Sequence, residues 1–248
     1  MHVIIPSKGR PPTKTYKLLG DIPFTHLVEP QDEADYKAAN VPNLCVIPKN
    51  DQGIAYVRNY LLHYAETKGL DWVWAMDDDV QGFGIAKAGK TIKSDHTVLS
   101  SFHADVSQYK FPVNGINYCQ HAWSYSTGKT RFMINRKTAE VCTLLYIPKI
   151  TWSYRGRLNL KEDRDFCMQS IVHSSGILFD THRWFNCPGV GTNAGGLQDL
   201  YKQNRDAVSA AKFVDEWKPY AKLVKKGERT DAKLDLKGLA LAHNKQVR

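Results

Sequence analysis

Apolar and polar positions in the first 80 residues alternate in blocks that predict strands and a helix in turn. Short apolar runs predict strands at 3–5, 25–29 and 44–47, and apolar positions at helical spacing predict a helix over 52–68. The run Trp72–Met76 is apolar throughout, which is typical of a strand buried on both faces. Strands and helices that alternate in this way predict an α/β fold with a mostly parallel sheet flanked by helices.

The remaining chain has a weaker pattern. Residues 81–130 are polar, aromatic and rich in glycine, and a region of this length with so little periodicity is typical of a functional insertion. Further strands are predicted at 131–135, 144–148 and 177–180, helices at 161–173 and 197–220, and a flexible loop at 188–196. The expected organisation is one domain at 1–200, followed by a basic, mainly helical extension at 201–248.

Composition narrows the class of protein. Of the 248 residues, 42% are hydrophobic and 24% are charged, which is ordinary for a soluble globular chain. No apolar run approaches the roughly 18 residues of a membrane-spanning helix, and the N-terminus lacks the layout of a signal peptide. The 5 cysteines show no C-x-x-C spacing, which favours reduced thiols over a structural zinc site. We therefore expect a cytoplasmic protein without a membrane partner.

The charge of the chain suggests a kind of partner. There are 34 Lys and Arg against 25 Asp and Glu, a net charge of +9, and part of the excess lies in residues 218–248. An excess of positive charge attracts polyanions, among which nucleic acid is the commonest. A solvated helix face or a loose basic tail is the simpler interpretation of the same residues.

Three consecutive carboxylates follow the apolar run Trp72–Met76. Asp77, Asp78 and Asp79 would emerge at the carboxyl edge of the sheet, where open α/β sheets bind their ligands. Side chains alternate along an extended chain, so Asp77 and Asp79 point to the same side. Acids this close repel one another unless positive charge lies among them, and a hard divalent cation that carries substrate phosphates fits. A solvated acidic turn is the plain structural alternative.

Three other clusters could contribute to the same ligand-binding site. Pro6–Arg10 follows the first strand and offers amides, a hydroxyl and cations to a nucleotide. Arg58 lies near the start of the predicted helix 52–68, where its guanidinium can reach a diphosphate. Lys161–Asp165 begins another helix, where acids complement the helix dipole and one of them can act as a general base toward an acceptor hydroxyl. Each cluster has a plain structural alternative. Strand-to-turn segments such as Pro6–Arg10 often contain Ser, Gly and Lys, Arg58 can be an exposed helical arginine, and helix capping explains one or two of the three acids at Lys161–Asp165.

One motif points to a different class of protein. Gly84–Thr91 matches G-x-x-x-x-G-K-[ST], the phosphate-binding loop of many nucleotide hydrolases, and Ile177–Asp180 could supply a magnesium-binding strand. That loop should follow its strand directly and open the fold, yet here Asp77–Asp79 intervene and the strand is the fourth. We interpret the match as a coincidence.

Taken in order, the four clusters resemble glycosyltransferases of the GT-A fold, which is Rossmann-like, over roughly residues 1–200. The acidic triplet is similar to the D-x-D metal motif of that fold, and Glu162-Asp163 to its later E-D acceptor motif. Within the fold, the short basic chain and its Ile-Pro-Ser-Lys-Gly-Arg start resemble the TET/JBP-associated glycosyltransferases. Members of that family are thought to glycosylate hydroxymethylated pyrimidines in DNA, many of them in bacteriophages.

The resemblance implies a role for each motif residue. Asp77 and Asp79 would hold Mn²⁺ or Mg²⁺ on the diphosphate of a nucleotide sugar, a UDP-sugar such as UDP-glucose, with His182 as the third ligand. Asp163 would be the base and Glu162 its partner. The other donor-binding residues would be Pro6, Ser7, Lys8 and Arg10 at the nucleoside, Arg58 at the diphosphate and Asp78 at the sugar or ribose.

The resemblance also implies the chemistry. One base acting in a single displacement inverts the sugar, although a retaining route stays open. The acceptor would be a 5-hydroxymethylpyrimidine such as 5-hydroxymethylcytosine in DNA, and a phage-encoded enzyme would act in the host cytoplasm. Two alternatives remain. One is the same fold acting on a protein or glycan, and the other is a phosphate-loop or non-enzymatic nucleic-acid-binding protein whose acids are structural.

Overall fold

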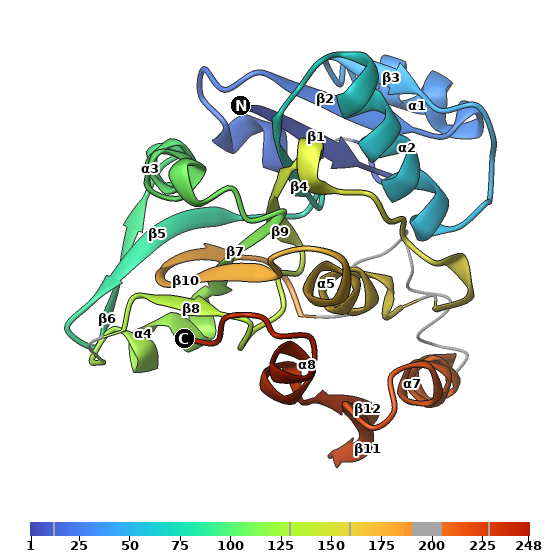
Figure 1. Cartoon of the computed structure of the whole chain (residues 1–248). Coiled ribbons are helices and arrows are strands. Elements are labelled where there is room, and N and C mark those ends of the chain that lie inside the picture. The colour runs from blue at the N-terminus through green and yellow to red at the C-terminus, as the bar shows by residue number, and fades with distance from the viewer. Residues whose placement is uncertain (12, 129, 159, 190–204, 228) are drawn as a thin grey trace.

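The computed structural model describes residues 1–11, 13–128, 130–158, 160–189, 205–227 and 229–248. At its centre is a ten-stranded sheet, drawn in Figure 1, with the strand order β3-β2-β1-β4-β9-β7-β10-β5-β6 and with β8 paired to β10 outside this order. A separate two-stranded sheet belongs to the C-terminal part of the chain. No helix in the described part of the chain is both long and apolar enough to cross a membrane.

The first half of the sheet is parallel. β1 (His2–Pro6) lies between β2 (Phe24–Val28) and β4 (Trp72–Met76), and β3 (Leu44–Val46) pairs with β2 at the edge. All four strands run in one direction, so their carboxyl ends meet at one edge of the sheet. These strands lie within one residue of their predicted ends, and the prediction of Trp72–Met76 is confirmed at both ends.

The second half of the sheet is largely antiparallel. β9 (Cys142–Tyr146) runs antiparallel to both β4 and β7 (Val113–Tyr118), while β7 is parallel to β10 (Ile177–Asn186). β5 (Gly82–Lys87) pairs antiparallel with β10 and with β6 (Lys90–Ser94). The α/β class is therefore confirmed, and the sheet is mixed, with its parallel pairs concentrated at β3-β2-β1-β4.

The region 81–130 is not an irregular insertion, and this prediction was wrong. It supplies β5, β6 and β7 together with the helices α3 (Thr97–Val106) and α4 (Cys119–Tyr125). β7 is hard to detect because polar residues occupy buried positions in it. Asn114 is fully buried and donates hydrogen bonds to the carbonyl oxygens of Phe111 at 2.8 Å and Leu144 at 3.1 Å. A buried amide nitrogen whose hydrogen bonds are made in this way is compatible with a central strand.

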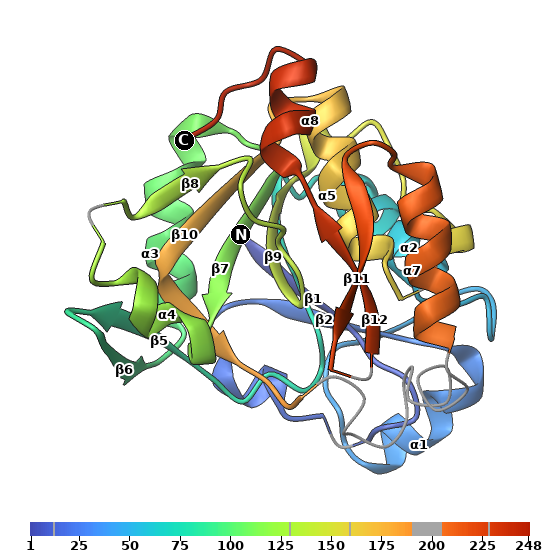
Figure 2. The ribbon, with the colours of Figure 1, turned by 90° about the horizontal axis from the view of Figure 1, so that it is seen from below.

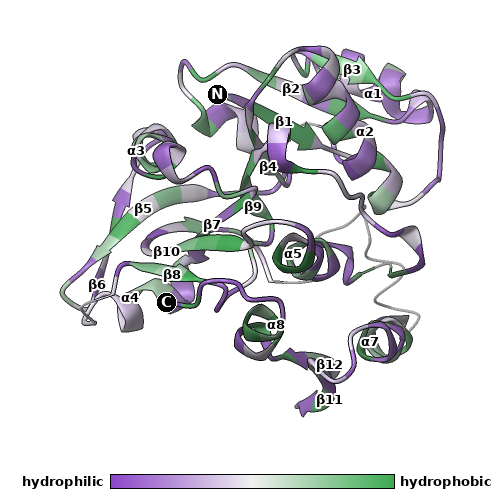
Figure 3. Ribbon diagram, in the orientation of Figure 1, coloured by the Kyte–Doolittle hydropathy of each residue, from purple (hydrophilic) through white to green (hydrophobic). Residues whose placement is uncertain are grey.

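Helices cover both faces of the sheet. α2 (Ile54–Thr67) and α5 (Glu162–His173) pack into one apolar cluster, and α3 packs into a second. Val73 belongs to the first cluster and Trp74 to the second, and neither is exposed, which explains the unbroken apolar run of β4. Figure 3 shows the hydrophobic residues concentrated along the strands of the sheet.

The remaining short elements lie around this core. They are α1 (Glu33–Ala38), β8 (Phe132–Ile134) and 3-10 helices at Thr15–Leu18, Pro30–Asp32, Ser107–Tyr109, Ile147–Lys149 and Gly156–Leu158.

The described C-terminal part contains a β-hairpin as well as helices, so the prediction of a mainly helical segment is not confirmed. α7 (Arg205–Glu216) is followed by a hairpin of β11 (Ala221–Lys226) and β12 (Arg229–Leu234), and then by α8 (Leu236–Ala242). Figure 2 shows this hairpin beside α7. The predicted helix 197–220 is confirmed over 205–216, while 197–204 and most of the predicted loop 188–196 lie outside the described residues.

The segment that matches a phosphate-binding loop is a β-hairpin. Gly84–Thr91 runs through β5, a two-residue turn and β6, with Lys87 opposite Lys90. The turn residues Ala88 and Gly89 have positive φ angles of 51° and 76°, as in the turns that best join antiparallel strands. A phosphate-binding loop leads from a strand into a helix, so the phosphate-loop alternative was wrong for this segment.

Gly84 provides a test of how tightly this hairpin is held. A Cβ atom on Gly84 would lie 2.1 Å from the Trp184 ring and 2.2 Å from the Ile92 carbonyl oxygen, whereas one on Gly82 would meet nothing within 4 Å. We expect Gly84→Ala to lower the free energy of unfolding in urea by about 1–3 kcal/mol, the usual cost of overpacking, and Gly82→Ala to lower it by less than about 1 kcal/mol. Equal effects of the two substitutions would contradict this packing.

Candidate active site

The loop that follows β1 folds over the acidic triplet at the end of β4. β1 and β4 are parallel neighbours, so Pro6 and Met76 end at the same edge of the sheet. Ser7 Oγ donates a hydrogen bond to the Asp78 carboxylate, and Arg10 Nη2 lies 2.6 Å from Asp78 Oδ1. The predicted nucleoside-binding loop and the predicted metal motif are therefore joined directly.

Asp78 lies in the interior rather than at the surface of this site. Only 1% of its side chain is exposed, and the Tyr36 hydroxyl closes over it, 2.6 Å from Ser7 Oγ. Burial raises the pKa of Asp78 to about 7, although the charge of Arg10 and the hydrogen bond from Ser7 oppose this shift. The structure thus uses Asp78 to anchor the loop, while the sequence had suggested a contact with the sugar or ribose.

Asp77 and Asp79 are the acids of the triplet that remain accessible. Their side chains are 36% and 28% exposed, and each lies near one guanidinium. Asp77 Oδ1 is 3.4 Å from Arg58 Nη2, and Asp79 Oδ2 is 3.2 Å from Arg10 Nη1. Burial raises the pKa of Asp77 to about 6, with the charge of Arg58 lowering it and that of Asp79 raising it. These two carboxylates are placed to meet a ligand at the sheet edge.

Lys8 connects the ends of the neighbouring strands. Its Nζ atom lies 2.8 Å from Glu29 Oε2, just after β2, and 2.5 Å from Asp51 Oδ1, after β3. The Lys8 side chain is 40% exposed, so it can still reach a bound molecule. Pro6, Ser7, Lys8 and Arg10 therefore all lie along the carboxyl edge, as predicted from their position after β1, with Ser7 buried.

Arg58 joins the acidic triplet to the first turn of α5. Its side chain, 13% exposed, extends from α2 to within 3.4 Å of Asp77 and 3.5 Å of Glu162 Oε1, and lies over the ring of Tyr154. Glu162 is 4% exposed, and its second oxygen, Oε2, has no hydrogen-bond partner among the described residues. Glu162 therefore holds Arg58 in position and keeps one buried acceptor oxygen.

Asp163 faces the same interior space as the donor-side residues. Pro6, Arg58, Asp77 and Asp163 line one small cavity with room for about one water molecule. Asp163 Oδ1 accepts the backbone N–H of Arg164 at 2.7 Å. Burial raises the pKa of Asp163 to about 8, with the nearby charge of Glu140 adding to the shift. A nucleotide sugar is far larger than this cavity, so it would lie over the sheet edge outside it.

Two residues near Asp163 were missed as site residues. Tyr118, at the carboxyl end of β7, has a pKa well above its ordinary value, because it is buried and lies near the charges of Glu140, Asp163 and Asp77. Glu140 precedes β9 and carries no motif, so only the fold reveals it. The position of Tyr118 at a strand end was the available signal, but β7 itself was not predicted.

The residues at the edge offer two carboxylates to a metal. Among the residues that the structure describes, no group of three or more His, Cys, Asp or Glu side chains is placed to hold an ion. His182 lies within β10, where its backbone N–H donates to Asp180 Oδ1 at 2.8 Å, and the structure does not bring it into such a group. Asp77 and Asp79 still fit a hard cation of the Mg²⁺ kind, which commonly binds one or two carboxylates and takes its other ligands from phosphates and water.

Comparison with known proteins identifies the class of enzyme. The model of the TET-Associated Glycosyltransferase family matches residues 1–196. The chain belongs to this family. It is therefore a glycosyltransferase, and the resemblance to the TET/JBP-associated glycosyltransferases is confirmed.

Other comparisons add little to this assignment. A solved structure titled "Crystal Structure of A197 from STIV" is 16% identical in sequence, over 73% of this chain and 82% of that chain, with a TM-score of 0.43. This likeness is too low to carry an argument. The comparison with curated proteins returned no match.

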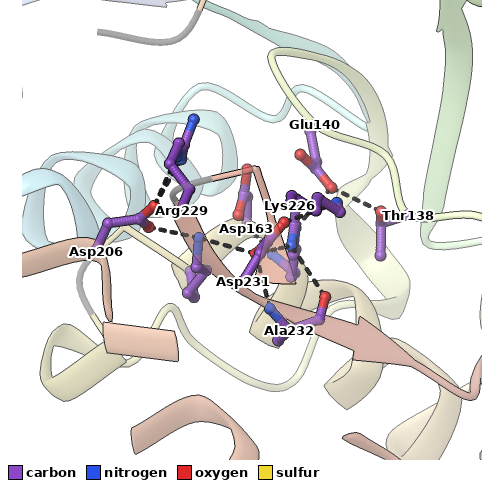
Figure 4. Close-up of polar contacts among 10 residues, drawn as sticks. Thr138, Glu140, Asp163, Asp206, Lys226, Arg229, Asp231 and Ala232 are labelled. Carbon is purple, nitrogen blue, oxygen red and sulfur yellow. Dashed lines mark hydrogen bonds and ion pairs between the residues drawn. The ribbon is translucent and has the colours of Figure 1, made fainter. Parts of the chain in front are cut away.

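Beyond the matched residues, the C-terminal part of this glycosyltransferase holds the first turn of α5 in place (Figure 4). Lys161, only 5% exposed, lies 2.7 Å from Asp206 and 3.3 Å from Asp231. Arg164 lies 2.8 Å from Asp231 and 3.1 Å from Glu140. Asp231 on β12 is thus shared by the two cations that flank the acidic pair of α5.

A second contact fixes the same turn. Asp165 is fully buried, accepts a hydrogen bond from Arg155 Nε at 2.8 Å and another from Trp217 Nε1 at 2.8 Å. Arg155 also pairs with Glu216 at the end of α7. The three acids of this turn therefore have separate environments, since Asp165 binds the C-terminal part, Glu162 binds Arg58, and Asp163 faces the cavity.

The link between β12 and α5 predicts a pH-dependent contribution to stability. Burial alone would raise the pKa of Asp231, but the hydrogen bond from Lys226 and the charges of Arg164 and Lys161 outweigh it and hold the pKa well below the usual 3.8. A carboxyl group whose pKa is lowered by folding stabilises the folded state at pH values above its ordinary pKa. This contribution is lost as the pH falls below about 4.

We expect Asp231→Asn to reduce the free energy of unfolding at pH 7 by about 3 kcal/mol, because it leaves buried cations with one partner fewer. The difference from wild type should shrink when unfolding is measured at about pH 3. Asp215→Asn, at a side chain that is 79% exposed, is the control and should change stability by less than about 0.5 kcal/mol. If the difference in unfolding free energy between wild type and Asp231→Asn is the same at pH 7 and at pH 3, the lowered pKa of Asp231 is contradicted.

Proposed function

We propose that this glycosyltransferase has the GT-A fold and transfers a sugar from a nucleotide sugar to the hydroxyl of a 5-hydroxymethylpyrimidine in DNA, with a divalent metal and with inversion. The observation that carries the proposal is the shared cavity of Asp163, Arg58 and Asp77. It brings a carboxylate suited to proton removal next to the groups suited to phosphate binding. The free state of all 5 cysteines supports a reducing compartment such as the cytoplasm.

The donor would lie across the carboxyl ends of β1 and β4. Asp77 and Asp79 would hold Mn²⁺ or Mg²⁺, which would neutralise negative charge on the diphosphate of a UDP-sugar when bound. Lys8 and Arg58 carry the positive charge that reaches toward the phosphates. Arg10 acts mainly through the loop, because it pairs with both Asp78 and Asp79 and so fixes the direction of the Asp79 carboxylate.

The acceptor side would be served by the first turn of α5. Asp163 would take the proton of the acceptor hydroxyl while the oxygen attacks the anomeric carbon of the sugar. The bond from that carbon to the nucleoside diphosphate breaks as the new one forms, and attack from the opposite face inverts the configuration. Glu162 would contribute indirectly, because it keeps the guanidinium of Arg58 beside Asp77.

A DNA acceptor is supported by charge and by exposed side chains. The net charge is +9, and Lys222, Lys225, Lys233 and Lys237 are exposed on the C-terminal part. Trp123 on α4 is 55% exposed and could stack on a base that has left the duplex. Removing the whole C-terminal part would not test whether its lysines bind DNA, because Lys161 and Arg164 would also lose their ion pairs with Asp231.

Asp163 should control the pH dependence of turnover. A carboxyl with a pKa of about 8 is protonated at lower pH and cannot accept a proton, so kcat should rise with pH up to about 8 and then level off. Asp163→Asn should lower kcat by about 10²–10⁴-fold, remove this pH dependence and leave donor affinity near normal.

Glu162→Gln serves as the matched control for Asp163→Asn. It should mainly weaken donor binding, because it loosens Arg58 rather than the base. If Glu162→Gln is the inactive variant with the flattened pH profile and Asp163→Asn is nearly normal, the roles within the pair are reversed.

The decisive experiment is a panel of nucleotide sugars tested with hydroxymethylated DNA, unmodified DNA and a protein acceptor. We expect product only with a nucleotide sugar, Mn²⁺ or Mg²⁺ and hydroxymethylated DNA, detected as a mass increase of the modified nucleoside. Chelation should stop transfer reversibly, and Asp79→Asn should abolish it without unfolding the protein. Equal transfer to the protein acceptor would favour the glycan or protein alternative, and full activity of Asp79→Asn would refute the metal assignment.

A further inference from the structure

The β5–β6 hairpin is a surface that the catalytic proposal leaves unused. It lies at the end of the central sheet and extends away from the body of the molecule in both Figure 1 and Figure 2. β6 pairs only with β5 among the described strands, and all five of its residues are exposed. The ribbon formed by β5 and β6 is thus the outer edge of the central sheet, because β5 also pairs with β10 from Gly82 to Ile85, and one face and one edge of the ribbon are open to solvent.

The two faces of this ribbon differ. One face packs on α4 and β10 through Ala86, Ala122 and Trp184. The other carries Ile85 and Ile92, which are directly opposite each other in the pairing and are 40% and 47% exposed. Exposed cross-strand apolar pairs of this kind are unusual in a surface that contacts only water.

Positive charge surrounds the apolar pair. Lys87 and Lys90 are the next cross-strand pair toward the turn on the same face, and Lys93 follows Ile92 on the edge strand β6, with its side chain on the other face. All three are exposed, and none forms an ion pair with an acid within the described part of the chain. The span Gly82–Ser94 contains no Asp or Glu. The charge of the ribbon therefore stays available for a polyanion.

The ribbon is held firmly in its conformation. The Gly89 amide in the turn donates to Ser126 Oγ at 2.9 Å, which ties the tip to the end of α4. Gly84 lies so close to the Trp184 ring that no larger residue would fit without movement. A preformed surface loses less freedom when it binds a partner.

The ribbon also begins at the active site. β5 starts at Gly82, three residues after Asp79, and the Gln81 amide donates to the Asn186 carbonyl at 2.8 Å where β10 ends. Six strand residues span about 20 Å, so the surface leads outward from the acids over a length similar to the width of a DNA duplex. A polymer that lies on the ribbon would be directed to the carboxyl edge.

We propose that the β5–β6 ribbon is the docking surface for duplex DNA, with Lys87, Lys90 and Lys93 at the phosphates and the Ile85–Ile92 pair in the major groove. A two-stranded ribbon fits that groove, and the 5-position of pyrimidines, which carries the hydroxymethyl group, is exposed there. This inference rests on the proposed DNA acceptor. The alternative is that the lysines only protect a free sheet edge from pairing with other chains.

The test compares two triple variants that remove the same charge. One is Lys87→Gln/Lys90→Gln/Lys93→Gln, and the other is Lys68→Gln/Lys110→Gln/Lys149→Gln at exposed positions on the opposite, amino edge of the sheet. Binding to a duplex that contains 5-hydroxymethylcytosine is measured by fluorescence anisotropy at several salt concentrations. Loss of three phosphate contacts should reduce the slope of log K against log salt by about 2–3 and weaken binding by about 10-fold or more at 0.1 M salt.

The opposite-edge triple should bind as wild type does. Equal losses in the two triples would mean that binding depends only on net charge, and would overturn the proposal. No loss in the ribbon triple would overturn it as well. Ile85→Thr/Ile92→Thr keeps strand-forming residues and should weaken binding without changing the salt slope. A wild-type dimer that these two substitutions dissociate in light scattering would show instead that the ribbon binds a second copy of the chain.

The same variants separate this inference from the proposed function. If wild type binds DNA through the ribbon but transfers sugar to no DNA, the proposed function fails and the docking surface stands. If wild type glycosylates hydroxymethylated DNA and the ribbon triple binds that DNA as wild type does, the docking surface alone fails. Hydrolysis of the nucleotide sugar without DNA is measured in parallel, so that a damaged donor site is recognised.

Discussion

The position of Arg58 is the constraint on which the arrangement of the active site depends. Its guanidinium is largely buried and lies between Asp77 on the β4 side and Glu162 on α5. Without this cation, two carboxylates would face each other across a space that holds little water, and their repulsion would separate the two walls of the site. The contact with the Tyr154 ring adds a second restraint on the same group. The residues proposed to bind the donor and the acceptor converge because Asp77 and Glu162 share this one positive charge.

A second buried ion pair, between Asp78 and Arg10, gives the three acids of the triplet different environments. Asp78 turns inward and is bound by Arg10 and Ser7, so the loop after β1 is fixed to the end of β4. β4 ends at Met76 and the chain turns at Asp78 and Asp79, so that Asp78 is buried while Asp77 and Asp79 stay partly exposed. Three adjacent acids are tolerated because one of them is neutralised in the interior while the other two each meet a guanidinium.

The C-terminal part of the chain supports the first turn of α5, where the proposed base lies, rather than only adding charge. Lys161 and Arg164 belong to the region that the family model matches, yet Asp206 and Asp231, their partners, lie beyond it. The first turn of α5 is thus supported by a segment outside the residues that the family model matches. Of the many lysines in that segment, Lys226 is already engaged by Asp231, which leaves fewer of them for a polyanion than the composition suggests.

The sequence by itself determined the elements whose pattern is local. The unbroken apolar run of β4, the helical spacing of α2 and the acidic first turn of α5 were all predicted, because burial on both faces or on one helix face leaves a periodic signature. The short basic chain and its Ile-Pro-Ser-Lys-Gly-Arg start, added to the order of the four clusters, also indicated the family. Candidate residues at strand ends could be placed at one edge because parallel strands end together.

Only the tertiary structure decided the remainder. β7 was hidden by buried polar residues such as Asn114, which donates one hydrogen bond to the distant Leu144 carbonyl oxygen. The hairpin of Gly84–Thr91 resembled a phosphate-binding loop because a motif records residue types and not what they pair with. The inward turn of Asp78, the role of Glu140 beside Asp163 and the attachment of Asp231 to α5 all depend on contacts between residues far apart in the chain. Long-range charge pairing leaves no periodic mark on the sequence, and for that reason it appeared only once the chain was folded.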